Sequence, residues 1–171
     1  MPLTAELRET REALVIEHME SENRQEFDVT LDTFQHPRYE LIATGDVFDG
    51  PEEVAAYFEE TRSAFPDQRN QLTALHHADD AVIVEATLYG THLGSFRGLP
   101  ATGRKFELEF CAMFVFEGEG LVCERVYFDA GTILRQLGIA HDPLTLRGRF
   151  ATIVNHPVTI GGALVRRLTG R

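Results

Sequence analysis

Residues 105–116 alternate strictly between apolar and mostly polar residues, and this pattern constrains the fold most. A repeat of two is the spacing of a β-strand, in which successive side chains point to opposite faces. One face is expected to form an apolar wall against a helical layer or a cavity, and the other to face water or a polar subunit interface. The wall consists of Phe106, Leu108, Phe110, Ala112, Phe114 and Phe116.

A hairpin is predicted directly after this strand. Residues 117–120 (EGEG) carry the glycines typical of a tight turn, and a second β-rich run follows them as far as Asp129. A turn centred on residues 118–119 places Phe110 opposite Tyr127 in the paired strands. We therefore expect Tyr127 on the apolar side of the hairpin.

Helices and further strands are predicted on both sides of the hairpin, which gives an α+β chain. His18 lies on the apolar stripe of the first helix, so we expect it to face the core. Two further helices are predicted at 27–34 and 49–65, strands at 39–43, 70–77 and 81–93, and a last helix between Asp129 and Gly138. A chain of 171 residues without low-complexity tracts is expected to form one core and to bury about 70% of its unfolded surface.

Three motifs within the second half of the chain carry a family resemblance. They are residues 90–94 (GTHLG), residues 98–104 (GLPATGR), and Asp129 followed by residues 134–138 (LRQLG). In this order and spacing they resemble the SnoaL-like polyketide cyclase family of the nuclear-transport-factor-2-like superfamily, over about residues 8–139. The resemblance implies a curved antiparallel sheet wrapped with helices into a cone (1–138) around a hydrophobic cavity, and a homodimer paired through its sheets.

The cyclase chemistry does not carry over residue by residue. The resemblance implies an acid/base aspartate on the last strand, a few residues before Asp129, and a histidine on the preceding strand. The sequence instead places Val126 or Tyr127 at the first position, and Cys111, Ala112 or Met113 at the second.

Asp129, Tyr127 and His92 are the catalytic candidates that remain. Asp129 would accept and return a proton, Tyr127 would donate a hydrogen bond to a developing enolate oxygen, and His92 or His18 would supply a second proton-transfer group. Each residue has a structural alternative. Asp129 is well placed to cap the last helix, Tyr127 to form part of a cavity wall, and His92 to hold the connection between strand and loop.

Ligand contacts are expected from His18, Tyr39, Tyr57 and Phe110. A buried histidine satisfied by hydrogen bonds is the alternative for His18. With such a cavity, the first functional hypothesis is an acid/base enzyme of the isomerase, cyclase or hydratase kind, acting on a small hydrophobic carbonyl compound. The second hypothesis is a protein of the same fold that binds a small hydrophobic ligand without turnover.

No cofactor or metal is expected, because the sequence lacks a glycine-rich phosphate loop, Cys/His metal spacing and a nucleophile elbow. A net charge of −11 argues against binding nucleic acid.

Without a leader-like start or an apolar run of membrane-spanning length, the chain is expected to be cytoplasmic. Cys111 and Cys123 do not face each other in the predicted hairpin, so a disulfide is not expected.

The C-terminal extension, residues 139–171, differs from the rest of the chain in charge. After Asp142 it holds five arginines and no acidic residue, so this part carries +5 and the remainder of the chain −16. Two amphipathic helices, broken at His156 and Pro157, are predicted. We expect them to pack on the acidic body of the same or a neighbouring subunit. A membrane surface and a distinct protein are the alternative partners.

Overall fold

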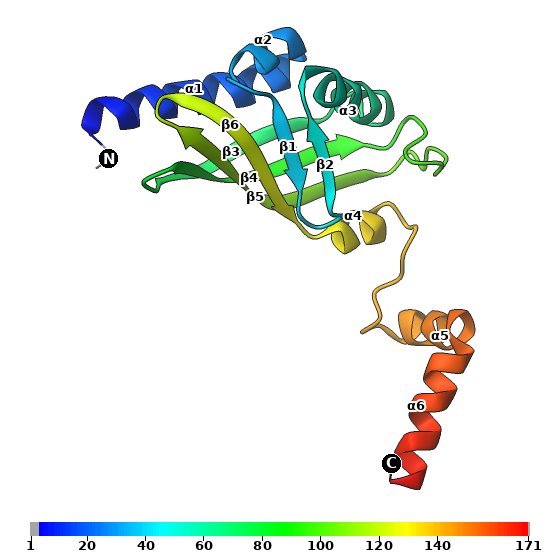
Figure 1. The fold of residues 1–171 in the computed structure, drawn as a ribbon. Helices are drawn as coiled ribbons and strands as arrows, with labels where there is room; N and C mark the ends of the chain where they lie inside the picture. Colours follow the sequence, from blue (N-terminus) through cyan, green and yellow to red (C-terminus); the bar gives the residue numbers. More distant parts are fainter. Residues whose placement is uncertain (1–3, 171) are drawn as a thin grey trace.

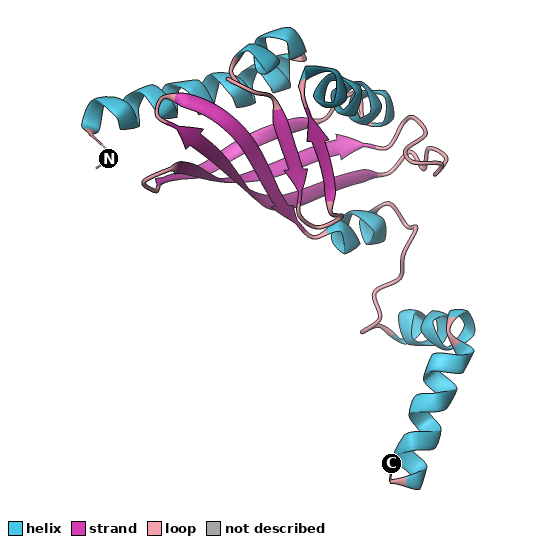
Figure 2. Cartoon of the chain, viewed as in Figure 1, coloured by secondary structure: helices cyan, strands magenta, loops and turns pink. Residues whose placement is uncertain are grey.

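A computed structural model describes residues 4–170 and has the predicted α+β class, with a curved sheet that does not close (Figures 1 and 2). The strands are β1 (Arg38–Leu41), β2 (Asp46–Asp49), β3 (Arg69–His77), β4 (Ala81–Thr91), β5 (Lys105–Glu117) and β6 (Gly120–Phe128). The helices are α1 (Ala5–Arg24), α2 (Phe27–Asp32), α3 (Pro51–Ala64), α4 (Ala130–Gln136), α5 (Leu146–Asn155) and α6 (Pro157–Thr169).

The sheet has the order β2-β1-β6-β5-β4-β3. All neighbouring strands are antiparallel except β1 and β6, which run parallel. The sheet is therefore mixed, whereas the family resemblance led us to expect an antiparallel one. Strand β2 was not predicted, because a four-residue edge strand with only alternate residues half-buried leaves little pattern in a sequence.

Helices α1, α2 and α3 lie along one face of the sheet (Figure 1). Their apolar residues pack on β4 and β5, where Val82, Val84, Ala112 and Phe114 are almost completely buried. The apolar wall of β5 thus faces the helical layer along part of its length. Towards the start of β5, Phe106 and Leu108 belong to a second cluster with Phe65 and Leu137.

The predicted pairing of β5 with β6 is wrong by one residue. A bulge between Val115 and Phe116 shifts the register, so that Phe110 pairs with Phe128 and Tyr127 pairs with Cys111. One residue of shift moves every side chain beyond the bulge to the opposite face. Tyr127 therefore lies on the polar face and is 42% exposed.

The same shift turns Glu124 inward. Glu124 pairs with Phe114, and directly opposed residues of an antiparallel pair point to the same face. The glutamate accordingly lies on the side of the apolar wall and is only 6% exposed.

The C-terminal extension forms two helices, α5 and α6, which are separated at His156 as predicted. They pack against each other and lie apart from the sheet in Figure 1. Their apolar side chains are exposed, among them Phe150, Val158 and Leu168. Packing on a partner subunit stays a prediction. Within residues 4–170, no helix is long and apolar enough to cross a membrane.

Candidate functional site

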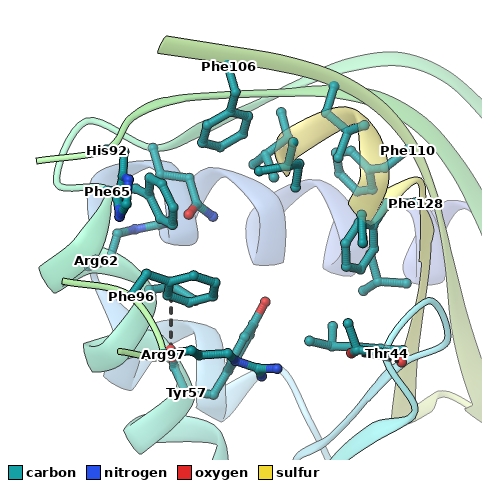
Figure 3. A pocket seen from close by; sticks show the side chains of 18 of the residues that line it. Thr44, Tyr57, Arg62, Phe65, His92, Phe96, Arg97, Phe106, Phe110 and Phe128 are labelled. Carbon is teal, nitrogen blue, oxygen red and sulfur yellow. Dashed lines mark hydrogen bonds between the residues drawn. The ribbon is translucent and has the colours of Figure 1, made fainter. Parts of the chain in front are cut away.

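A pocket of about 290 Å³ lies between the sheet and helix α3, with α4 and the loop after β4 at one end (Figure 3). Most of its wall is aromatic or aliphatic. Tyr57 and Phe58 of α3 contribute to it, as do Phe106, Leu108 and Phe110 of β5, Val126 and Phe128 of β6, and Phe65, Phe96, Ile133 and Leu137. Such a lining suits a small hydrophobic molecule.

Two buried carboxylates, Glu22 of α1 and Glu124 of β6, also line this pocket. Both oxygens of Glu22 accept hydrogen bonds: Oε1 from the hydroxyl of Tyr39 at 2.7 Å, and Oε2 from the side-chain amide of Asn70 at 2.7 Å. Glu22 is therefore held in one orientation by neighbours on two different strands.

Glu124 differs from Glu22 because its Oε2 atom is buried and has no hydrogen-bond partner among residues 4–170. Nε2 of His18 lies 3.2 Å from this oxygen. Buried polar atoms without partners are rare in folded proteins. A bound molecule that presents a hydrogen to Glu124 would supply the missing contact.

His18 is fully buried between these groups and makes a hydrogen bond through each ring nitrogen. The Thr33 hydroxyl donates to the carbonyl of Thr30 at 2.6 Å, so it must accept from His18 Nδ1, which lies 2.7 Å away. On the other side, Nε2 lies 2.7 Å from the hydroxyl of Tyr39, which donates to Glu22 Oε1. His18 therefore links helix α1 to strand β1 through this hydroxyl.

Burial and charge shift the acidity of this cluster in a consistent direction. The pKa of Glu22 is raised, first by burial and then by the negative charge of Glu124; His18, Arg62 and the hydrogen bond from Tyr39 oppose the shift. The pKa of Tyr39 is raised well above its ordinary value by burial and by both glutamates. Tyr39 therefore remains a hydrogen-bond donor, while Glu22 holds a proton more readily than an exposed glutamate.

The same three residues, His18, Glu22 and Glu124, offer ligand atoms within 4.8 Å of one another, a spacing that a metal ion can bridge. An ion there would have to displace the hydrogen bonds from Tyr39 and Asn70 to Glu22. In the structure each oxygen of Glu22 already accepts a hydrogen bond. The expectation of no metal stays a prediction.

Asp129 caps helix α4. Its Oδ1 accepts from the backbone amide of Gly131, and its Oδ2 accepts from the hydroxyl of Thr132 and from Arg135. These hydrogen bonds lower the pKa of the exposed carboxyl, with Thr132 the largest cause. Asp129 is not among the residues that line the pocket, so its geometry matches the capping alternative.

The structure does not bring the three catalytic candidates together. Tyr127 lies on the polar face of the sheet, because the bulge after Val115 pairs it with Cys111. His92 is fully buried and lines the pocket, without Asp129 or Tyr127 beside it there. The three residues therefore lie at separate positions, and their catalytic role stays a prediction.

Three of the four expected ligand contacts, Tyr39, Tyr57 and Phe110, do line the pocket. The hydroxyl of Tyr57 points into it (Figure 3). His18 is not among the lining residues, but its Nε2 lies 2.7 Å from the hydroxyl of Tyr39 and 3.2 Å from Glu124 Oε2, and both of these residues line the pocket. Their role in binding stays a prediction.

Sequence reasoning missed Glu22 and Glu124, although each left a signal. Glu22 follows His18 by four residues, which places both on the same face of a helix. Glu124 is the one charged residue on the side of β6 that also holds Val122, Val126 and Phe128. A charge within an apolar face of a strand indicates a buried polar site.

Comparison with known proteins agrees with this architecture. The model of the SnoaL-like polyketide cyclase family matches residues 13–137. The chain belongs to this family. The matched region comprises the sheet, all of α2, α3 and α4 and most of α1, and ends before the C-terminal extension. The comparison with curated proteins gives no significant match.

Solved structures of similar fold come from several bacteria. TsrD from Streptomyces laurentii is 25% identical, with a TM-score of 0.67 over 77% of this chain and 97% of that protein. IdmH from Streptomyces antibioticus, a proposed polyketide cyclase, is 25% identical, with a TM-score of 0.63 over 75% and 98%. AclR from Streptomyces galilaeus, a proposed hydroxylase, is 20% identical and shares the fold, with a TM-score of 0.66 over 77% and 87%.

Proposed function

We propose that this chain is a cofactor-independent acid/base enzyme of the isomerase, cyclase or hydratase type, acting on a small hydrophobic carbonyl compound in the pocket. One observation carries the proposal. Glu124 is a buried carboxylate that lines an apolar pocket, and its Oε2 has no hydrogen-bond partner among the described residues. A buried carboxylate oxygen without a hydrogen bond is available to accept a proton from a bound molecule.

In the proposed step, Glu124 takes a proton from the carbon next to the carbonyl group. The C–H bond breaks, an O–H bond forms on Glu124, and the electron pair moves to the carbonyl oxygen to give an enolate. Return of the proton to the same or another atom completes the reaction.

Family membership supports this assignment. The resemblance places an acid/base aspartate at the position of Val126 or Tyr127; Glu124 lies on the same strand, a few residues earlier, and lines the pocket. We assign Glu124 the role that the sequence analysis gave to Asp129.

Hydrogen exchange tests the proposal without knowledge of the natural substrate. Cyclic ketones such as 1-tetralone are incubated with the protein in D₂O, and deuterium at the α-carbon is measured by mass spectrometry. We expect catalysed exchange, reduced about 10²- to 10⁴-fold by Glu124→Gln. Glu107→Gln, on the polar face of β5, is the matched control and should exchange at the wild-type rate. Equal rates for the Glu124→Gln and wild-type proteins would exclude Glu124 as the base.

A ligand-binding protein without turnover is the second candidate. The observation in its favour is that both oxygens of Asp129, the sequence-predicted base, are occupied at the start of α4. Saturable binding of a ketone panel by calorimetry, with no exchange above the buffer rate for any member, would favour this candidate over the enzyme.

A further inference from the structure

The protonation of His92 follows from its hydrogen bonds. His92 comes directly after β4, and its Nδ1 lies 3.3 Å from the backbone nitrogen of Thr102. A backbone N–H can only donate, so Nδ1 accepts and the hydrogen of the neutral ring is on Nε2. The hydroxyl of Thr102, 3.2 Å from Nδ1, is free to donate to the same nitrogen.

The Nε2 atom of His92 is a buried donor without an acceptor in the part of the chain that the structure covers. The residue is fully buried and belongs to the pocket lining. Its ring packs on Phe65, with the centroids 5.2 Å apart (Figure 3). A donor in such apolar surroundings is costly unless something pairs with it.

We infer that the Nε2–H group of His92 binds an acceptor oxygen of the pocket's ligand, a carbonyl oxygen, and so selects carbonyl-bearing compounds over hydrocarbons of the same shape. This inference rests on the proposed function for the assumption that the pocket holds a small molecule. Arg62, which also lines the pocket, has a second buried donor without a partner among residues 4–170, at Nε. The pocket thus combines unpaired donors with the unpaired oxygen of Glu124.

A neutral oxygen fits this pocket better than a carboxylate. The lining already holds two acidic residues, Glu22 and Glu124, against two arginines, Arg62 and Arg97, so its formal charges cancel. A carboxylate ligand would add a buried negative charge without a matching cation. A ketone or quinone carbonyl adds no charge and needs only one hydrogen bond.

The test compares 1-tetralone with tetralin, which lacks only the carbonyl oxygen. Affinities of both are measured by isothermal titration calorimetry for wild type, His92→Phe and His92→Gln. We expect the preference for the ketone to fall about 10-fold in His92→Phe, which keeps the aromatic packing but has no donor. His92→Gln should retain part of the preference, because its amide can accept from Thr102 and donate to the ligand. An unchanged preference in His92→Phe overturns the inference.

Two further measurements make the result decisive. If His92→Phe does not fold, ¹⁵N NMR of the wild-type imidazole decides: the hydrogen must reside on Nε2, and the Nε2 signal must shift with 1-tetralone but not with tetralin. His76→Phe, which changes an exposed histidine hydrogen-bonded to Glu85, controls for the loss of an imidazole elsewhere. Repeating the titrations in Glu124→Gln separates this inference from the proposed enzyme, because binding preference does not require turnover.

Discussion

Replacing Tyr39 by Phe tests whether the hydrogen bonds of its hydroxyl to Glu22 and His18 stabilise the fold. Tyr39 is 2% exposed, and its hydroxyl lies 2.7 Å from both Glu22 Oε1 and His18 Nε2. The substitution removes two hydrogen bonds to charged groups, each contributing about 1.5–3 kcal/mol. Since Glu22 keeps its bond to Asn70 and can take up a proton, we expect the free energy of unfolding to fall by about 3 kcal/mol. That change corresponds to a Tm lower by about 6–12 °C.

Urea unfolding of the full chain at pH 7, followed by circular dichroism, measures this change. Tyr57→Phe is the matched control: Tyr57 lines the same pocket, but its hydroxyl makes no hydrogen bond to any residue from 4 to 170. The control should lose about 0.5 kcal/mol or less, because no paired group is left behind. If both variants unfold at the same urea concentration as wild type, the buried network does not hold the fold together and the reasoning fails.

Three further predictions concern Glu22, Asp129 and the C-terminal extension. Because burial raises the folded-state pKa of Glu22 above its ordinary value of 4.5, wild-type stability should fall as the pH rises from 4.5 through that pKa. Glu22→Gln should remove this pH-dependent loss. The difference in free energy of unfolding, variant minus wild type, should therefore increase with pH by at most about 1.4 kcal/mol per pH unit, as measured by urea unfolding at several pH values. Asp129→Ala should lower the Tm by about 2–4 °C through loss of the α4 cap, and ketone exchange per folded molecule should be unchanged. Deleting residues 139–171 should leave the calorimetric Tm of the cone within about 2 °C, because α5 and α6 lie apart from the sheet. An unchanged number of subunits in sedimentation would exclude the extension from assembly.

The sequence predicts the fold well where a local pattern decides the structure. The period-two strand, the glycine-containing turn after it and the capped helix at Asp129 all depend on residues close together in the chain. The C-terminal helices, broken at a proline, are of the same kind. Short β2 carries no such pattern.

The site was harder to predict because it depends on register and on contacts between distant elements. One bulged residue near Val115 decides whether Glu124 or Tyr127 faces the pocket, and nothing in the local sequence marks that bulge. His18 was expected in the core from its helical stripe, but its partners Tyr39 and Glu124 come from β1 and β6. Only the assembled sheet brings these residues together.

The two buried glutamates have different surroundings, and these assign them different roles. Glu22 accepts a hydrogen bond on each oxygen, so Tyr39 and Asn70 fix its position. Oε2 of Glu124 has no hydrogen bond from any residue between 4 and 170. When Glu124 takes up a proton, the negative charge that raises the pKa of Glu22 disappears. Glu22 then holds a proton less tightly, so the two carboxylates take up a first proton more readily than a second.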